Sequence, residues 1–441
     1  MPVEIDEVAS APSLPAETKV VVVGGGIIGT STAYFLAEQG IPTLLCEKGV
    51  IAGEQSSRNW GWCRTMGRDP RELPLAIESL KLWREINLRI GAETGFRPTG
   101  TLYLCPDAAT FAKREAWLPL ARQHGLETRL LRGGEVNDVL KGAVGSWLGA
   151  LYTPGDGVAE PSKATPALAV AARRHGAGIM TGCAVRGIEK RGGRISAVMT
   201  EKGRVACEAV VLAGGAWSSL FCRSLGLRLP QLRVLASVLR TGPVLGGPTP
   251  AAWGPGLALR RRIDGGYTVS HGSVIADIVP DSFRFFAAFL PALRMERKGI
   301  KLRLGKPFFD DWRLSKPWRL DAASPFEKLR VLDPAPDAHD LAAARVNLEC
   351  IFPIFRGVPT SASWAGLIDV TPDILPIISA VDAIPGFYIS TGYSGHGFGI
   401  GLGAGRLTAD LVSGKTPIVD PSPFRYSRFI DGTRMEPLAG L

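Results

Sequence analysis

The sequence of 441 residues has no uninterrupted run of the roughly 20 apolar residues that an α-helix needs to span a bilayer. It has no C-x-x-C pair, and its seven cysteines are odd in number, which favours free thiols in a reducing cytoplasm. None of its five histidines lies within one helical turn of another, and it has no Gly-x-Ser-x-Gly or Gly-Lys-Ser/Thr motif. These absences argue against an integral membrane protein, a histidine metal site, an α/β-hydrolase nucleophile and a phosphate-binding loop.

Glycine and positive charge, by contrast, are abundant. The 53 glycines form no G-X-Y repeat, so they predict many turns and close backbone contacts, not a collagen-like rod. The length and the 46% apolar content predict more than one packed domain. A net charge of +10 would suit nucleic acid, anionic lipid or an acidic partner, but a solvated surface is the simpler interpretation, and we do not predict a nucleic-acid partner.

The first strong pattern begins at residue 19. A β-branched run at 19–23 predicts a strand buried on both faces of a parallel sheet, followed by a helix at 30–39 and a second strand at 43–47. Between strand and helix, Gly24, Gly26 and Gly29 suit a tight turn, close approach of a pyrophosphate, and helix–strand packing. Glu47 would accept hydrogen bonds from a ribose, and the helix N-terminus would face the phosphates. The unit predicts dinucleotide binding; a purely structural glycine turn is the alternative.

The segment after Glu47 indicates which dinucleotide is bound. Residues 53–64 read Gly-Glu-Gln-Ser-Ser-Arg-Asn-Trp-Gly-Trp-Cys-Arg. This stretch resembles the matching segment of the FAD-dependent amino-acid oxidoreductases that include D-amino acid dehydrogenase, glycine oxidase and sarcosine oxidase. In that family small hydroxyl residues contact the pyrophosphate and an Asn-x-Gly passes the flavin ring, and Ser56, Ser57, Asn59 and Gly61 occupy those places. A polar loop without a ligand is the alternative.

Later blocks resemble the same family in the same order. They are 156–161 before an alanine-rich helix, strands at 183–190, 195–198 and 205–213 ending in a glycine turn, the pair 364–367 and 371–376, and 387–399 before a closing helix at about 397–413. In the last block the glycines would let backbone N–H groups approach the electron-rich edge of a reduced flavin. The resemblance implies noncovalent FAD bound by Gly24, Gly26, Ile27, Ile28, Gly29, Glu47, Lys48, Gln55, Ser56, Ser57, Arg58, Asn59, Gly61, Trp62, Val185, Ala213, Gly214, Trp217, Gly395, His396, Gly397, Phe398 and Gly399.

We therefore expect an α/β plus α+β fold, in which a discontinuous Rossmann-like FAD-binding domain is interleaved with an antiparallel-sheet substrate domain. The expected parts are a flexible tail at 1–18, the FAD-binding domain at 19–62, 151–225 and 364–441, and the substrate domain at 63–150 and 226–363. The substrate domain should contain a helix near 71–90, strands at 101–105 and 232–241, and a hairpin that turns at Asp264 and Gly265.

The resemblance implies that hydride passes from the carbon bearing the amine of an amine or amino acid to flavin N5, and that water hydrolyses the imine. A D-amino acid, an N-alkyl amino acid or an opine-like amine is the expected substrate. Many relatives carry Arg just after Trp-Ala-Gly-Leu, where this chain has Ile368 and Asp369, so the carboxylate anchor is missing or moved. Arg64 and Arg356 are replacement candidates, with a salt bridge as the alternative.

Four further residues have two interpretations each. Tyr393 and His396 are candidates to orient substrate or tune the ring, and His396 could instead make a structural hydrogen bond. Trp60 and Trp62 would wall the pocket or belong to the core. No metal is predicted.

Residues 284–330 carry twelve Lys or Arg and five Asp or Glu, interleaved with aromatic and apolar residues. This basic segment could contact an anionic membrane or a partner subunit, or could be a solvated insertion. The expected electron acceptor is oxygen or a quinone of the respiratory chain, and the expected location is the cytoplasm, with peripheral contact with the inner membrane as an alternative. Two other functions stay open: oxidation of a modified tRNA base, and a flavin-loaded subunit of a multi-subunit dehydrogenase.

Overall fold

The strand–turn–helix–strand unit at the start of the chain forms the centre of a parallel sheet. The computed structural model describes residues 3–296, 299–314 and 317–440. In it β1 (Val20–Val23) leads through α1 (Ile27–Glu38) to β2 (Thr43–Cys46), and β1 pairs in parallel with β2 and β12 (Ala209–Leu212). The sheet order is β20-β21-β12-β1-β2-β8, and only its β20–β21 edge pair is antiparallel among the described strands. Its other strands are β8 (Gly178–Met180), β20 (Ile377–Ala380) and β21 (Phe387–Thr391).

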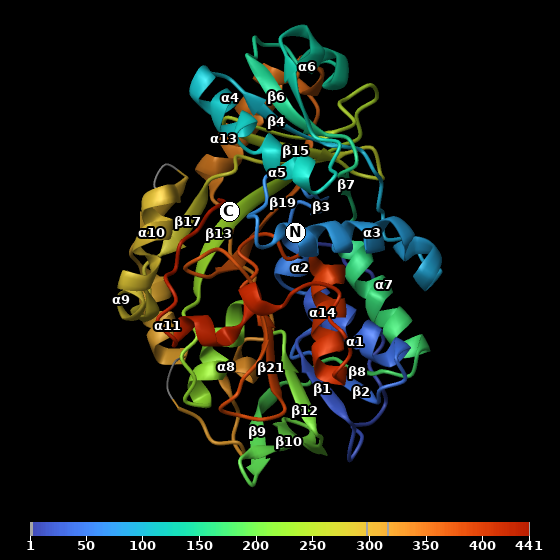
Figure 1. Cartoon of the computed structure of the whole chain (residues 1–441), viewed down its shortest axis with the longest axis vertical. Coiled ribbons are helices and arrows are strands. Elements are labelled where there is room, and N and C mark those ends of the chain that lie inside the picture. Colours follow the sequence, from blue (N-terminus) through green and yellow to red (C-terminus); the bar gives the residue numbers. More distant parts are fainter. Residues whose placement is uncertain (1–2, 297–298, 315–316, 441) are drawn as a thin grey trace.

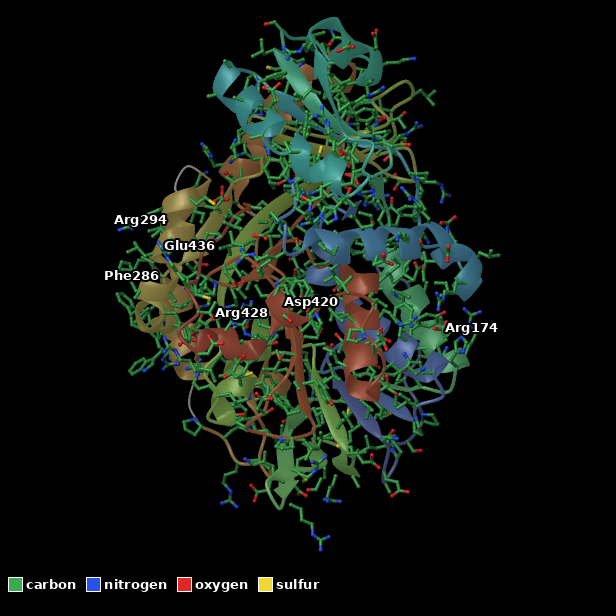
Figure 2. All side chains as sticks on the ribbon, in the orientation of Figure 1. Arg174, Phe286, Arg294, Asp420, Arg428 and Glu436 are labelled. Carbon is green, nitrogen blue, oxygen red and sulfur yellow. The ribbon has the colours of Figure 1, made fainter. Side chains whose placement is uncertain are left out.

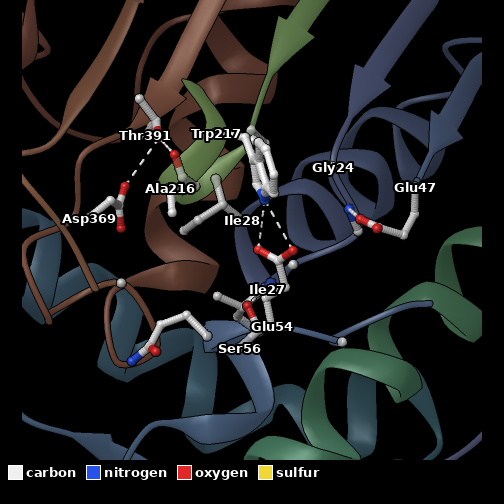
Figure 3. A pocket seen from close by; sticks show the side chains of 18 of the residues that line it. Gly24, Ile27, Ile28, Glu47, Glu54, Ser56, Ala216, Trp217, Asp369 and Thr391 are labelled. Carbon is white, nitrogen blue, oxygen red and sulfur yellow. Dashed lines mark hydrogen bonds between the residues drawn. The ribbon is translucent and has the colours of Figure 1, made fainter. Parts of the chain in front are cut away.

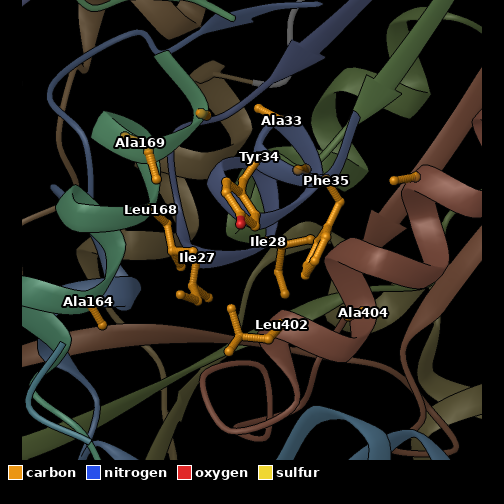
Figure 4. Packing of buried hydrophobic residues seen from close by; sticks show 14 of the residues in the cluster. Ile27, Ile28, Ala33, Tyr34, Phe35, Ala164, Leu168, Ala169, Leu402 and Ala404 are labelled. Carbon is orange, nitrogen blue, oxygen red and sulfur yellow. The ribbon is translucent and has the colours of Figure 1, made fainter. Parts of the chain in front are cut away.

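Helix α1 is buried on all sides, which explains why its sequence shows little amphipathic pattern. Every residue from Ile27 to Ala37 is buried. Helix α7 (Pro161–Arg174) and helix α14 (Gly401–Ser413) pack against it, so that Leu168 and Leu402 lie beside Ile27 (Figure 4). The first and last parts of the chain thus share one core, as expected for a discontinuous domain.

The predicted strand at 205–213 is wrong as a single element. The chain forms β11 (Gly203–Ala206), an edge strand of a small antiparallel sheet with β10 (Arg194–Thr200) and β9 (Val185–Arg191), and then β12 in the parallel sheet. The break at residues 207–208 has a physical reason: there the backbone leaves β10, and the N–H of Glu208 donates to the carbonyl of Lys19 at 3.0 Å. The chain turns at Gly192 and Gly193 between β9 and β10, which pair as a hairpin.

The second domain is built on a larger, mostly antiparallel sheet that runs from the top of Figure 1 to the middle of its left side. Its strand order is β18-β17-β13-β16-β15-β14-β4-β6-β5, with β19 paired to β13. The predicted helix near 71–90, the strands at 101–105 and 232–241 and the hairpin at Asp264 and Gly265 are confirmed. The strands are β4 (Thr101–Cys105), β5 (Arg129–Arg132), β6 (Gly149–Thr153), β13 (Leu232–Thr241), β14 (Ala251–Gly254), β15 (Leu257–Arg261), β16 (Tyr267–Ser270), β17 (Val274–Asp277), β18 (Ile300–Arg303) and β19 (Thr360–Val370).

Further helices pack on this sheet or on the domain built on the parallel sheet. They are α2 (Gln55–Arg58), α3 (Leu73–Ile90), α4 (Ala108–Glu115), α5 (Leu118–Gln123), α6 (Gly134–Val139), α8 (Ser218–Ser224), α12 (Pro325–Lys328) and α13 (Ala338–Ile351). The short pair β3 (Trp62–Cys63) and β7 (Gly157–Val158) links the domains. Beside it the buried Arg260 pairs bidentately with the buried Glu160 at 2.7 and 3.0 Å, which fixes β15 against the start of α7.

Residues 280–296 and 299–314, called the insert below, project from one side of the molecule. The insert contains α9 (Pro280–Arg284), α10 (Phe286–Glu296), β18 and α11 (Lys306–Leu314). Phe286 and Arg294 lie at the outer edge of this side in Figure 2. The insert exposes a group of large apolar side chains: Phe283, Phe286, Met295, Leu302, Leu304, Phe309 and Trp312. No helix among the described residues is long and apolar enough to cross a membrane.

The N-terminal segment lies along the domain built on the parallel sheet, which the sequence predicts to bind FAD and which is called the cofactor domain below. It forms no helix or strand between residues 3 and 18, but its N–H groups at Asp6, Ala11 and Thr18 donate to backbone carbonyls of Ser162, Ile179 and Ala206. All seven cysteines are free, as the sequence predicted, and only Cys350 among them is exposed.

Candidate functional site

The β1–α1 turn has the geometry that its glycines predict. Gly24 has a φ of +110°, and a Cβ there would overlap the carbonyl oxygen of Ala213. A Cβ at Gly29 would overlap the carbonyl oxygen of Gly24. Only glycine allows both the turn and the close packing of α1 on β1. The first N–H groups of α1 therefore stay at the edge of the sheet, where no acceptor within the helix can reach them.

A cleft begins at this turn and runs between the two domains. It encloses about 1260 Å³, part of it open to solvent. Figure 3 shows residues from the turn, the end of β2, α2 and the ends of β12 and β19 around it. The predicted cofactor residues that line it are Gly24, Gly26, Ile27, Ile28, Glu47, Lys48, Gln55, Ser56, Asn59, Val185, Ala213, Gly214, Trp217, Gly395, Gly397 and Phe398. The structure thus brings together residues from both ends of the chain.

Glu47 and Ser56 are held by backbone N–H groups at one end of the cleft. The N–H groups of Gly25 and Gly49 each donate to one Glu47 carboxylate oxygen at 2.7 Å. Burial nevertheless raises the pKa of Glu47 from its ordinary value. The N–H of Ile27 donates to Ser56 Oγ at 2.8 Å, so a hydroxyl lies at the helix N-terminus. Both side chains keep lone pairs available for a sugar or phosphate ligand.

Trp217, Glu54 and Lys48 form a polar group on the opposite wall. Trp217 Nε1 donates to both Glu54 oxygens at 3.1 Å, and Lys48 Nζ pairs with Glu54 Oε1 at 2.6 Å. The same ammonium lies 4.5 Å from the Trp217 ring centre. This arrangement fixes the indole as a flat apolar wall, because its polar edge is already hydrogen-bonded. Sequence reasoning found Lys48 and Trp217 but missed Glu54.

Asp369 at the end of β19 is a second residue that sequence reasoning did not place in the site. Its Oδ2 accepts hydrogen bonds from the Gly392 N–H at 2.7 Å, Gln231 Nε2 at 3.0 Å and Thr391 Oγ1 at 3.2 Å. It lines the cleft together with Ile368. Burial raises the pKa of Asp369, and these donors oppose that rise. In the sequence, only the departure of Ile368 and Asp369 from the family pattern pointed to Asp369 as a residue of the site.

The loop before α14 forms the far end of the cleft. Tyr393 lines the cleft, and its hydroxyl lies 2.8 Å from Ser390 Oγ. Burial raises the pKa of Tyr393, so the phenol stays protonated. Ser394 has a φ of +48°, a strained conformation that its hydrogen-bonded surroundings maintain. Helix α14 begins at Gly401 and not near residue 397 as predicted: residues 397–400 form turns, and Ser394 and Gly395 before them adopt left-handed backbone angles. The backbone of Gly395 and Gly397, instead of the first helical turn, therefore faces the cleft.

His396 points away from the cleft, toward the start of α3. Its Nδ1 lies 3.0 Å from a carboxylate oxygen of the buried Glu72, without the alignment of a good hydrogen bond. Burial, and then the charge of Arg68, lower the pKa of His396 to about 4, so the ring is neutral at physiological pH. This position suits the alternative of a structural role better than direct contact with substrate.

Several other predicted residues also lie outside the cleft lining. Arg64 is buried, donates to the Met66 carbonyl and lies 5.4 Å from the Tyr103 ring centre. Arg356 is exposed after η2 (Pro353–Phe355), on the substrate domain. Trp60 and Trp62 pack with Trp253 as an aromatic cluster. The remaining predicted cofactor residues that do not line the cleft are Gly29, Ser57, Arg58, Gly61, Trp62, His396 and Gly399.

Some of these residues hold the walls of the cleft in place. Arg58 Nη1 donates to the carbonyl of Ala365 at 2.9 Å, and Trp364 Nε1 donates to the carbonyl of Arg58 at 2.9 Å. A Cβ at Gly399 would lie 2.6 Å from the carbonyl oxygen of Trp62. Cys63, the cysteine of the 53–64 segment, is fully buried, and burial raises its thiol pKa well above the ordinary value. Such a thiol is a poor nucleophile.

The cleft fits a dinucleotide on three counts that come from the chain itself. Its turn is a glycine cradle that side chains would fill. Its acid lies at the end of β2, as a ribose requires. Gln55 Oε1 lines it as a buried oxygen with no hydrogen-bond partner among the described residues, so it can accept a hydrogen bond from a ligand.

Comparison with known proteins identifies the group to which this cleft belongs. The family model described as FAD dependent oxidoreductase (DAO) matches residues 19–411. A 4-methylaminobutanoate oxidase (formaldehyde-forming) of Paenarthrobacter nicotinovorans is 26% identical over 94% of this chain and 46% of its own length, so the chain spans about half of that relative. A D-amino acid dehydrogenase of Paramagnetospirillum magneticum is 25% identical over 93% of this chain and 99% of its own.

Solved structures are more similar still. An L-amino acid deaminase from Proteus myxofaciens, solved in complex with anthranilate, is 37% identical and covers 96% of both chains with a TM-score of 0.93.

Proposed function

The chain belongs to the family of FAD-dependent oxidoreductases, and from this we propose that it oxidises the C–N bond of an amino acid or a related amine. One observation carries the proposal: the cleft joins a dinucleotide-binding turn to a wall made by β19 and the loop before α14. FAD is the cofactor of this family, and when bound it supplies the hydride acceptor. The dinucleotide turn accounts for the cofactor, and the second wall leaves room for a small molecule beside it.

The chain's own residues position the reactants, and the side chains of the loop before α14 keep a fixed charge state. Glu47, Ser56 and the first turn of α1 would hold the ADP half of the cofactor. Tyr393 stays a neutral phenol and His396 a neutral imidazole, so neither brings a charge to the loop that faces the flavin. Glycines 395 and 397 expose backbone N–H groups there, which suits electron-rich atoms. Binding, orientation and exclusion of water are therefore the main contributions of the protein.

An L-amino acid is the substrate class that we propose first. The support is the similarity to the L-amino acid deaminase over nearly the whole of both chains. This changes our expectation from the sequence, which named D-amino acids, N-alkyl amino acids and opine-like amines. Those classes remain in the test, because D-amino acid dehydrogenase is also a relative over the full chain.

Anaerobic titration of the purified flavoprotein tests the proposal. Amino acids of both configurations, N-methyl amino acids and secondary amines are added singly, and flavin absorbance near its visible maximum is followed. We expect bleaching with at least one L-amino acid and weaker or no bleaching with its mirror image. Bleaching by a hydroxy acid and by no amine would overturn the assignment of the reaction. Co-purified RNA whose removal abolishes turnover would instead favour the tRNA-base alternative.

The insert favours an additional property, contact with an anionic membrane surface. Its exposed aromatic side chains include Phe309 and Trp312, which are 55% and 60% exposed, with Lys306 and Arg313 on the same helix. Apolar side chains beside cations suit an interface with acidic lipid. We expect co-sedimentation with vesicles that contain phosphatidylglycerol, weakened by salt, and none with neutral vesicles. Equal binding to both, or pull-down of a stoichiometric subunit without lipid binding, would contradict this and favour a partner protein.

A further inference from the structure

A segment from the substrate side closes over the cofactor cleft. Residues 324–333, called the strap below, overlap the end of the basic segment at 284–330 and contain the short helix α12. Three of its residues, Phe326, Arg330 and Val331, line the cleft beside Lys48 and Val185. The strap therefore supplies part of the cleft wall, although the sequence placed it in the substrate domain.

An apolar anchor fixes one end of the strap. Phe326 is 5% exposed, and its ring centre lies 5.8 Å from that of Trp217 and 5.9 Å from that of Phe221. Ser324 is buried and begins α12 with a capping box, in which Glu327 accepts from the Ser324 N–H at 2.8 Å. These contacts join the strap to α8, directly beside the cleft.

Two ion pairs tie the strap to the small antiparallel sheet. Glu327 accepts a bidentate pair from Arg186 on β9, with both N–O distances at 2.9 Å. Arg330 makes a second bidentate pair with Glu201, and its Nη1 also donates to the carbonyl of Lys48 at 2.8 Å. The hydrogen bonds of Arg186 lower the pKa of Glu327 to about 2. Paired guanidinium and carboxylate groups of this kind hold a fixed geometry.

The cofactor domain also binds the strap backbone directly. Lys48 Nζ donates to the carbonyls of Leu329 and Arg330 at 3.1 and 2.7 Å, and Glu54 Oε1 accepts from the Leu332 N–H at 3.0 Å. The contact is close, because a Cβ at Gly49 would lie 2.6 Å from the Arg330 carbonyl oxygen. Lys48 and Glu54 thus link the strap to the wall on which Trp217 lies.

We propose that the strap is a closing element of the FAD site and retains the ADP half of the cofactor. It lies over the end of the cleft where Glu47 and Val185 mark the adenosine position, and it has to lift for a dinucleotide to enter or leave there. Lifting breaks the Arg330–Glu201 pair and the bonds from Lys48, while the Phe326 anchor remains as a hinge. The inference rests on FAD as the family's cofactor and holds whichever amine is the substrate.

Release of FAD from the holoenzyme tests the strap. The holoenzyme is diluted into a large excess of an apoprotein that binds FAD tightly and serves as a trap, and the change in flavin fluorescence gives the release rate. We expect R330A and E201A to release FAD about ten-fold faster than the parent protein, because each breaks a part-buried charged pair. R319A is the matched control: Arg319 pairs with Asp321 just before the strap, but both side chains are largely exposed, and its release rate should not change.

A charge exchange separates closure from folding. Each single variant could lose FAD because it unfolds, so the double variant R330E/E201R is compared with R330E and E201R alone. If the double variant retains FAD as the parent protein does, and far-ultraviolet circular dichroism is unchanged in all three variants, the result supports closure by the strap. Equal release rates in R330A, R319A and the parent protein would overturn it. This experiment does not measure reduction of the flavin by a substrate. A panel in which no amine reduces the flavin would therefore leave its result intact.

Discussion

Helices α1 and α11 have opposite relations to the rest of the molecule. Every residue of α1 from Ile27 to Ala37 is buried. Of the described residues of α11, none is buried, and its two large aromatics are more than half exposed. The helix with the flat pattern is thus enclosed, and the helix with a clear apolar face lies in the insert with Phe309 and Trp312 largely exposed. Amphipathic spacing shows that a helix has an apolar side, but not whether the same chain covers it.

The first prediction concerns the turn that places α1. G24V introduces a Cβ into the Ala213 carbonyl at a φ of +110°, so the turn cannot form and FAD binding should be lost. The measurement is the ratio of flavin to protein after purification. G125A is the matched control, because Gly125 also has a positive φ of +66° but open space around it. It should keep full flavin content and lose only about 1 kcal/mol of stability. Normal flavin content in G24V would contradict the turn's role.

The second prediction concerns pH and the buried His396. Its folded pKa of about 4 lies below the ordinary 6.5, so the unfolded chain binds the additional proton between these values. The free energy of unfolding should therefore fall as pH drops from about 6.5 to about 4, by up to roughly 3 kcal/mol. Urea unfolding at several pH values measures this. H396N should be less stable at neutral pH and lose most of this dependence; an unchanged slope would show that other groups carry it.

The third prediction concerns the wall of the cleft that Trp217 forms. W217F keeps an aromatic ring but removes the N–H that donates to Glu54. The lost hydrogen bond, worth about 1.5–3 kcal/mol, no longer fixes the ring against the cleft, so FAD affinity should fall by up to about ten-fold. Flavin fluorescence quenching on titration of the apoprotein gives the dissociation constant. Unchanged affinity would mean that the Glu54 contact is not used when the cofactor is bound.

The smallest effect is expected in the insert. F309S/W312S removes two exposed aromatic side chains, so the free energy of unfolding should change by less than about 0.5 kcal/mol. Vesicle binding should weaken in the same variant. A large loss of stability would instead show that the two rings pack within the chain, and the contrast with α1 would fail.

The sequence predicted the parts of the site that follow local rules. The turn at Gly24 and the acid Glu47 lie in one βαβ unit, so their spacing placed them, and the resemblance of the next segment to the family placed Ser56. Glu54, Asp369 and Arg330 were missed because their positions depend on contacts between distant segments: Glu54 meets Trp217, Asp369 meets Gln231, and Arg330 meets Glu201. Arg64 and Arg356 were chosen for charge near a motif, and the fold places neither in the cleft lining.

Local sequence patterns also could not predict which strands pair with one another. Residues 205–213 have one continuous apolar pattern, yet they divide between two sheets because Ala206 pairs with β10 and Ala209 with β1. The end of α14 was predicted well, but its start was not, because glycine favours both helix-start loops and tight packing within helices.

The packing of α14 on α1 has a consequence for synthesis of the protein. A Cβ at Gly405 would overlap Ser31, so glycine at this position is what lets α14 lie so close to α1. Residues near 400 are synthesised many seconds after the first strand, at about 5–20 residues per second. The early βαβ unit therefore waits without its partner helix, and a nascent chain cannot complete its flavin site before α14 has been made.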